Sequence, residues 1–121
     1  MDYMFDVTVI GGGPGGYVAA IRAAQLGLKA AVIEERQMGG TCLNRGCIPT
    51  KSLLHSAEVF RTARHSKEYG ITLENVELDY SGIVNRKDKV VRLLRSGVES
   101  LVKGNGITVI SGRALLKDKN T

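Results

Sequence analysis

Two cysteines and the residues around them form a short stretch that could carry redox chemistry. Cys42 and Cys47 are the only cysteines, separated by four residues, and Lys51 follows the second by four positions. In an ideal α-helix, Cα atoms five residues apart lie roughly 8–9 Å from each other, whereas a disulfide needs Cα atoms within about 7 Å. If the two sulfurs pair, the backbone must therefore leave regular helix geometry between them. Gly46 gives the backbone that freedom, and Pro49 is typical of the first turn of a new helix.

More than one chemistry fits two nearby thiols. A thiol beside a helix N-terminus or a lysine has a lowered pKa and becomes the nucleophile of thiol–disulfide exchange. If helix persists from Cys47 to Lys51, this i,i+4 spacing puts both side chains on one face. A zinc site would need further ligands, and His55 and His65 are the only histidines. Spacing alone favours a redox pair but leaves two structural thiols as an alternative.

The run GGGPGG at residues 11–16 is a second candidate site. Gly11, Gly13 and Gly16 satisfy the G-x-G-x-x-G spacing of dinucleotide-binding turns. In such a turn the first glycine permits a tight bend, the second lets the backbone approach a pyrophosphate, and the third lets helix and strand pack closely. The helix N-terminus adds partial positive charge. The acid expected about 20 residues later, for a ribose hydroxyl, is Glu34. A glycine-rich turn that binds nothing is the alternative.

Hydrophobic periodicity indicates the elements that would position both stretches. Residues 5–10 and 29–34 are expected to be short buried strands, joined through a helix at residues 17–26. This βαβ unit places the glycine-rich turn at its first strand–helix junction. The remaining expected elements, in chain order, are a helix at 50–67, a loop at 68–79, a long amphipathic helix at 80–103, two strands at 107–110 and 114–117, and a turn at 118–120. Because no strand follows that last turn to pair with the sheet edge, we expect a fragment of a longer chain.

Composition places the chain among ordinary soluble globular proteins. Its 121 residues are 43% hydrophobic and 24% charged, and no apolar segment approaches the roughly 20 residues of a membrane span. The net charge of +5 comes from dispersed basic residues and aromatic residues make up only 5%, so neither nucleic acid nor membrane is an expected partner. The N-terminus lacks the basic region of a signal peptide, and two cysteines are too few for a secreted disulfide scaffold. We expect a cytoplasmic chain without a metal site.

These features together resemble the pyridine nucleotide–disulfide oxidoreductases. The resemblance covers the whole chain and rests on the glycine-rich turn, on Glu34, and above all on GGTCLNRGCIPTK at residues 39–51. Within the family, Leu43, Ile48 and the run KSLLHSAE most resemble the dihydrolipoamide dehydrogenases. Glutathione and mercuric reductases are similar but typically have valine at both apolar positions. Arg45 stands where the family often has valine, at a position with no assigned role.

The resemblance implies an α/β fold, a Rossmann-like FAD-binding domain with a parallel sheet, helices packed on it and a short antiparallel β element. Residues 1–121 would be the N-terminal part of that domain, truncated, with the NAD-binding and dimerisation domains absent. Glu34 would contact the adenosine ribose, Gly40 and Thr41 the pyrophosphate and flavin side, and Lys51 the region of flavin N5. A weaker match places Ala114 against the adenine. The full set of implied cofactor-binding residues is Gly11, Gly13, Pro14, Gly15, Gly16, Glu34, Glu35, Gly40, Thr41, Cys42, Cys47, Lys51 and Ala114.

The resemblance also implies a reaction and its partners. Cys42 would exchange with the disulfide substrate and Cys47 would lie against the flavin as a charge-transfer thiolate, so that electrons pass from dihydrolipoamide through this redox disulfide and FAD to NAD. The expected partners are a lipoyl-bearing acyltransferase or an H-protein-type carrier, and a second copy in a homodimer. In the family, the histidine–glutamate pair that acts as acid–base comes from the dimerisation domain of the partner subunit, which the resemblance implies is absent here. His55 and His65 match no catalytic motif. We therefore expect this chain alone to be inactive. The alternatives are a glutathione or mercuric reductase-like enzyme and a non-catalytic nucleotide-binding fragment.

Overall fold

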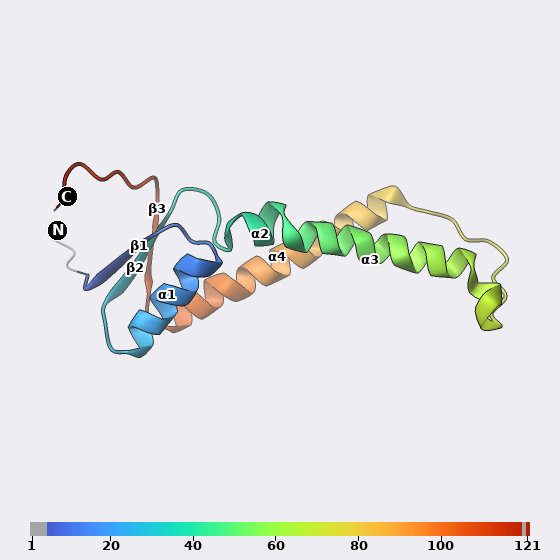
Figure 1. Ribbon diagram of the computed structural model, residues 1–121, viewed down its shortest axis with the longest axis horizontal. Coiled ribbons are helices and arrows are strands. Elements are labelled where there is room, and N and C mark those ends of the chain that lie inside the picture. Colours follow the sequence, from blue (N-terminus) through green and yellow to red (C-terminus); the bar gives the residue numbers. More distant parts are fainter. Residues whose placement is uncertain (1–4, 120) are drawn as a thin grey trace.

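Three parallel strands form the sheet of the structure, a computed structural model that describes residues 5–119 and 121 (Figure 1). The strands lie in the spatial order β1 (Val7–Ile10), β2 (Ala30–Glu34), β3 (Thr108–Ser111). Val32 of β2 is paired with Val9 on one side and with Val109 on the other. Residues 1–4, and Asn120 of the expected final turn, lie outside the described residues.

The connections between the strands are helical, as parallel strands require. The helices are α1 (Pro14–Gln25) between β1 and β2, then α2 (Gly40–Arg45), α3 (Cys47–Arg64), the 3-10 turn η1 (Ser66–Tyr69) and α4 (Tyr80–Gly104) between β2 and β3. α3 runs beside the first part of α4 and away from the sheet (Figure 1). In the part of the chain that the structure describes, no helix is long and apolar enough to cross a membrane.

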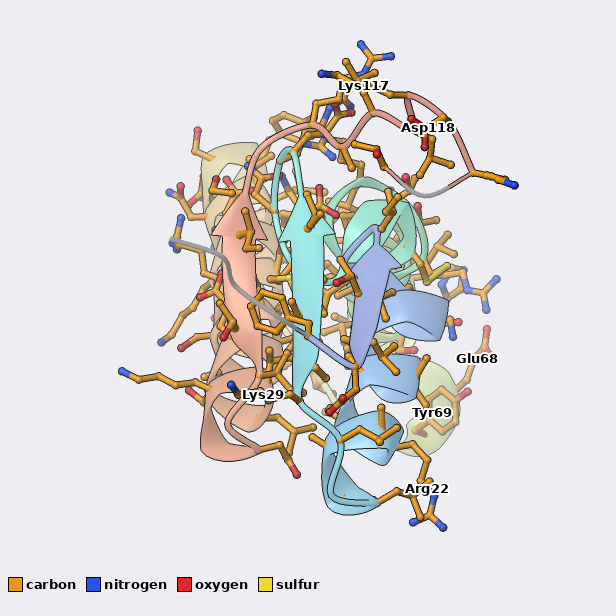
Figure 2. All side chains as sticks on the ribbon, turned by 90° about the vertical axis from the view of Figure 1, so that its left-hand side faces the viewer. Arg22, Lys29, Glu68, Tyr69, Lys117 and Asp118 are labelled. Carbon is orange, nitrogen blue, oxygen red and sulfur yellow. A yellow bond between two sulfur atoms is a disulfide. The ribbon has the colours of Figure 1, made fainter. Side chains whose placement is uncertain are left out.

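The core lies between one face of the sheet and two helices. Small residues of α1, Ala20 and Ala23, let this helix approach Val32 of β2, while Val102 of α4 and Ile107 close the cluster from the other end. Figure 2, which looks onto the sheet, shows the helices on its far side. This packing holds the carboxyl ends of the strands next to the starts of α1 and α2.

The parallel sheet and packed helices confirm the expected fold class, but its antiparallel element is wrong. Among the described residues, 113–117 form no strand, and β3 pairs with β2 in parallel instead. Leu115 and Leu116 are 76% and 80% exposed, so this segment has neither a neighbouring strand nor an apolar surface to stabilise it. A second difference is that α3 begins at Cys47, and the short helix α2 before it was not expected.

Candidate functional site

The glycine-rich turn between β1 and α1 is packed too closely to carry side chains. A Cβ on Gly16 would collide with the carbonyl oxygen of Gly11 and lie 3.3 Å from Cγ1 of Val9, which is the close packing expected of the motif's third glycine. Gly11 has a φ of 100°, in the region that favours glycine. Pro14 occupies the first turn of α1, and none of the described side chains caps that helix. Its first N–H groups are therefore free to face an anionic group.

Glu34 lies at this turn, as the spacing predicts. Its Oε2 accepts a hydrogen bond from the backbone N–H of Gly12 at 2.7 Å, and its Oε1 accepts one from the N–H of Arg36 at 2.8 Å. Gly12 itself was not among the predicted site residues. It is buried, and a Cβ there would lie 2.5 Å from Sδ of Met38. The unbroken run of three glycines was the available signal, because the motif leaves this middle position free.

A cavity of about 290 Å³ lies at the carboxyl ends of the strands, the place where open parallel α/β sheets bind ligands. It brings together four of the predicted residues, Gly11, Glu34, Glu35 and Ala114. Glu35 also lies 4.0 Å from Nε of Arg113, which lines the same cavity. A larger cavity of about 450 Å³, between β3 and α4, contains only Glu34 of the predicted set. The smaller cavity therefore holds more of the predicted residues.

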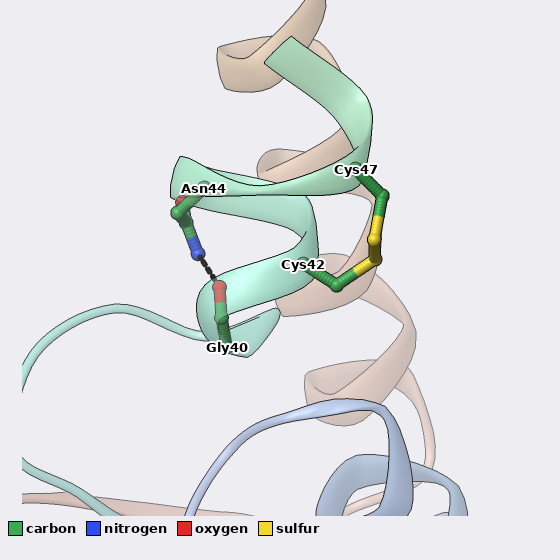
Figure 3. The surroundings of a disulfide bond; sticks show 4 residues. All are labelled: Gly40, Cys42, Asn44 and Cys47. Atoms are coloured by element: carbon green, nitrogen blue, oxygen red, sulfur yellow. Dashed lines mark hydrogen bonds between the residues drawn. A yellow bond between two sulfur atoms is a disulfide. The ribbon is translucent and has the colours of Figure 1, made fainter. Parts of the chain in front are cut away.

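The two cysteines form a disulfide at the junction of α2 and α3 (Figure 3). Their Cα atoms are 4.7 Å apart, closer than an unbroken helix allows. The break occurs at Gly46, with φ −124° and ψ −105°, as the sequence predicts. A Cβ on Gly46 would lie 3.2 Å from the carbonyl oxygen of Thr41 and 3.3 Å from Cα of Cys42. The missing side chain thus lets the two turns close on each other.

Gly39 and Gly40, at the start of the disulfide segment, contact the glycine-rich turn through backbone atoms. The N–H of Gly39 donates to the carbonyl oxygen of Gly12 at 2.8 Å. Gly40 has a φ of 65°, and a Cβ there would lie 2.8 Å from Cα of Gly13 and 3.4 Å from Cδ of Pro14. An apolar cavity of about 240 Å³ adjoins this contact, lined by residues of α1, α2, α3 and α4 that include Cys42. The two predicted sites are therefore one continuous surface.

The remaining predicted residues fall around this contact. Gly15 and Gly16 belong to the first turn of α1, Thr41 is exposed in α2, and Lys51 is exposed in α3 one turn after Cys47. Cys42 is half-buried, whereas Cys47 is exposed.

The two histidines have local contacts that lie outside this group of residues. Nδ1 of His55 lies 3.8 Å from Glu58, and Nδ1 of His65 lies 2.8 Å from the carbonyl oxygen of Arg61. Among the described residues, no group of three or more His, Cys, Asp or Glu side chains is arranged to hold a metal ion.

Comparisons with known proteins agree with this arrangement. A family model described as pyridine nucleotide-disulphide oxidoreductase matches residues 5–121. Proteins named dihydrolipoyl dehydrogenase are 58% identical over 116 residues in Chlamydia muridarum and 54% identical over 108 residues in Bacillus subtilis. These alignments cover 96% and 89% of this chain but 25% and 23% of the relatives. The chain thus spans about a quarter of their length.

A solved structure shows the same likeness in three dimensions. The Cu(II) complex of the HOCl-induced flavoprotein disulfide reductase RclA from Escherichia coli matches with a TM-score of 0.77 and 30% identity. The match covers 95% of this chain and 23% of that one. The described elements therefore correspond to one part of a larger flavoprotein fold.

Proposed function

The chain belongs to the pyridine nucleotide-disulphide oxidoreductase family, and from this premise we propose that residues 1–121 are the N-terminal part of the FAD-binding domain of a dihydrolipoyl dehydrogenase. The observation that carries the proposal is the backbone contact of Gly39 and Gly40 with the glycine-rich turn, because the proposed reaction needs the disulfide next to the bound flavin. The names and identities of the relatives favour dihydrolipoamide over other dithiols.

Several described residues support FAD as the cofactor. The carboxylate of Glu34 has roughly four acceptor positions. Two of them accept hydrogen bonds from the N–H groups of Gly12 and Arg36, so the others can accept hydrogen bonds from ribose hydroxyls. Glu35 and Ala114 line the cavity for the adenine side. The uncapped first turn of α1 would receive the pyrophosphate. Gly40, Thr41, Cys47 and Lys51 would face the flavin side. When bound, FAD supplies the two-electron acceptor between the dithiol and NAD.

The chain's own cysteines would carry the exchange with substrate. A thiolate of dihydrolipoamide attacks Sγ of Cys42, which forms a mixed disulfide and releases Cys47 as a thiolate. The second substrate thiol then displaces Cys42, so that two electrons and two protons leave the substrate as lipoamide. Cys47 is the first residue of α3 and Lys51 lies one turn later. The partial positive charge of the helix start and the lysine both favour a thiolate at Cys47.

The rest of the reaction needs parts that these 121 residues do not include. We expect NAD to be bound by a further domain, and the acid–base histidine to come from a dimerisation domain of a second copy. A lipoyl-bearing acyltransferase or an H-protein-type carrier would present the substrate. The cytoplasmic location stays a prediction from the sequence.

Substitution of each cysteine by serine in the longer enzyme that contains this segment tests the proposal. Cys42→Ser and Cys47→Ser should each abolish lipoamide-dependent NAD reduction while the purified proteins keep their flavin absorbance. Unchanged turnover in either variant would refute the assigned roles. A preference of the parent enzyme for glutathione disulfide or Hg(II) would refute the substrate class. The 121-residue chain alone should show no such turnover, and its visible spectrum shows whether it retains FAD.

A further inference from the structure

Asn44, between the two cysteines, makes three hydrogen bonds: one within its own helix α2, one to the residue pair before that helix, and one to α4. Its Nδ2 donates to the carbonyl oxygens of Met38, at 3.0 Å, and Gly40, at 2.9 Å. Its Oδ1 accepts a bond from Nη1 of Arg95 in α4 at 3.3 Å. Both amide donors are thus used, and turning the amide over would set its oxygen against two carbonyl oxygens. The orientation of this side chain is therefore fixed by its partners.

These bonds anchor a helix that could not hold its own shape. α2 has six residues, far fewer than the roughly 12–15 that an isolated helix needs in water. Met38 is only 5% exposed and belongs to the core cluster, and Gly40 packs on Gly13. Arg95 is half-buried. Asn44 therefore connects the turn that carries Cys42 to the core, to the glycine-rich turn and to α4.

The side chain of Asn44 points away from the disulfide. Figure 3 shows the side chain of Asn44 directed to Gly40, on the side of the ribbon away from the side chains of Cys42 and Cys47. Any effect of Asn44 on the sulfurs must accordingly pass through the backbone. When the disulfide is reduced, the covalent bond that holds the two Cα atoms at 4.7 Å is lost, whereas none of the hydrogen bonds of Asn44 involves a sulfur atom.

We propose that Asn44 is a positioning residue that sets the thiol–disulfide equilibrium of Cys42 and Cys47. By keeping α2 folded in the reduced state, it holds the two thiols close and lowers the entropy that the dithiol gains on reduction. A pre-organised pair of thiols has a higher effective concentration, so the disulfide is favoured and the dithiol is a stronger reductant. Without the anchor, reduction becomes easier. The proposal rests on the proposed function only in that the pair is redox-active.

The equilibrium can be measured on the 121-residue chain without FAD or turnover. Mixtures of reduced and oxidised dithiothreitol exchange with the protein: its S–S bond breaks, the cyclic disulfide of dithiothreitol forms, and two electrons and two protons move to the cysteines. Alkylation of the free thiols followed by intact mass gives the reduced fraction at each ratio. A failure of the FAD proposal would leave this measurement unaffected, so the two hypotheses fail separately.

Four variants separate the roles of the three hydrogen bonds. Asn44→Ala should raise the equilibrium constant for reduction about tenfold, roughly the contribution of one hydrogen bond, which corresponds to a potential about 30 mV more positive. Asn44→Asp keeps the acceptor for Arg95 but loses both donors, so its shift should be as large. Arg95→Met leaves the two donor bonds intact and should shift the constant less than about threefold. Asn85→Asp, at an exposed position of α4, is the control for charge.

The outcomes decide the proposal. The proposal is supported if the equilibrium constant for reduction rises about tenfold in both Asn44 variants and is unchanged in the Asn85→Asp control. An equilibrium constant within about twofold of the parent in Asn44→Ala, together with a lower melting temperature, would show that Asn44 only stabilises the fold and would overturn it. If Asn44→Ala does not fold by circular dichroism, Asn44→Asp carries the test. Equal shifts in Asn44→Asp and Asn85→Asp would overturn the proposal as well, because charge alone would then explain them.

Discussion

Replacing Gly16 by alanine tests how closely α1 approaches β1, and Gly15→Ala is a matched control one residue away. Both glycines lie in the first turn of α1. A Cβ on Gly15 would meet no atom within 4 Å, whereas a Cβ on Gly16 would collide with the backbone of Gly11 and lie 3.3 Å from Val9. The two substitutions are chemically identical and differ only in this surrounding space.

The expected effects have opposite signs. Alanine is favoured over glycine in a helix by about 0.5–1 kcal/mol, and Gly15→Ala should gain most of that. In Gly16→Ala the backbone of Gly11, directly after β1, cannot yield as a flexible side chain would, so α1 must move outward. Such overpacking costs about 1–3 kcal/mol, and we expect a net loss of about 2 kcal/mol. The melting temperature should then fall by about 8 °C for Gly16→Ala and rise by a few degrees for Gly15→Ala.

Urea-induced unfolding of the 121-residue chain, followed by circular dichroism, measures the unfolding free energies of Gly15→Ala and Gly16→Ala. Titration with FAD reports separately on the cofactor, because a displaced α1 no longer presents its first N–H groups to a pyrophosphate. An unfolding free energy of Gly16→Ala within about 0.5 kcal/mol of the parent would refute the close approach. So would an equal loss of stability in Gly15→Ala, since no atom is near enough to explain it.

Two further substitutions test other parts of the site. Glu34→Gln removes the charged acceptor from the N–H of Gly12 and from the ribose, so FAD affinity should fall about tenfold by titration; unchanged affinity would contradict the role of Glu34. Gly40→Ala combines a φ of 65° with a Cβ that would lie 2.8 Å from Cα of Gly13. It should lower the unfolding free energy by about 2–4 kcal/mol in urea titration, and an unfolding free energy within about 0.5 kcal/mol of the parent would contradict the backbone contact.

The glycine-rich turn could be predicted because the sequence pattern that indicates it is local. Glycine spacing, a strand before it, a helix after it and an acid at the end of the second strand all lie within residues 5–34. Each follows from backbone geometry over a few residues, and β1, α1 and β2 form as expected. The break at Gly46 was predictable for the same reason, since two cysteines five positions apart cannot pair across a regular helix.

Helix α2 could not be predicted, because its stability is not local. It begins at Gly40, follows a glycine in the left-handed region, and is six residues long, which disfavours a helix on propensity alone. Contacts with distant residues stabilise α2, namely those with Gly13 of the glycine-rich turn and Arg95 of α4. At residues 114–117 the error is the opposite one, a strand that was expected and does not form, and the cause is again that stability depends on distant residues. Their sequence is compatible with a strand, but no neighbouring strand is present among the described residues to pair with it.

Gly39 and Gly40, the glycine pair before the first cysteine, pack against the glycine-rich turn, a role that their own sequence does not suggest. Gly39 donates to Gly12, and Gly40 packs on Gly13, so two glycine pairs that are 27 residues apart meet backbone to backbone. None of these four glycines carries a side chain that could absorb a displacement. A shift of the glycine-rich turn must therefore move Gly40, where α2 begins, and with it Cys42, which lies two residues further along α2. Gly39 and Gly40 thus hold the disulfide segment against the glycine-rich turn, a contact between distant residues that the sequence of neither stretch reveals.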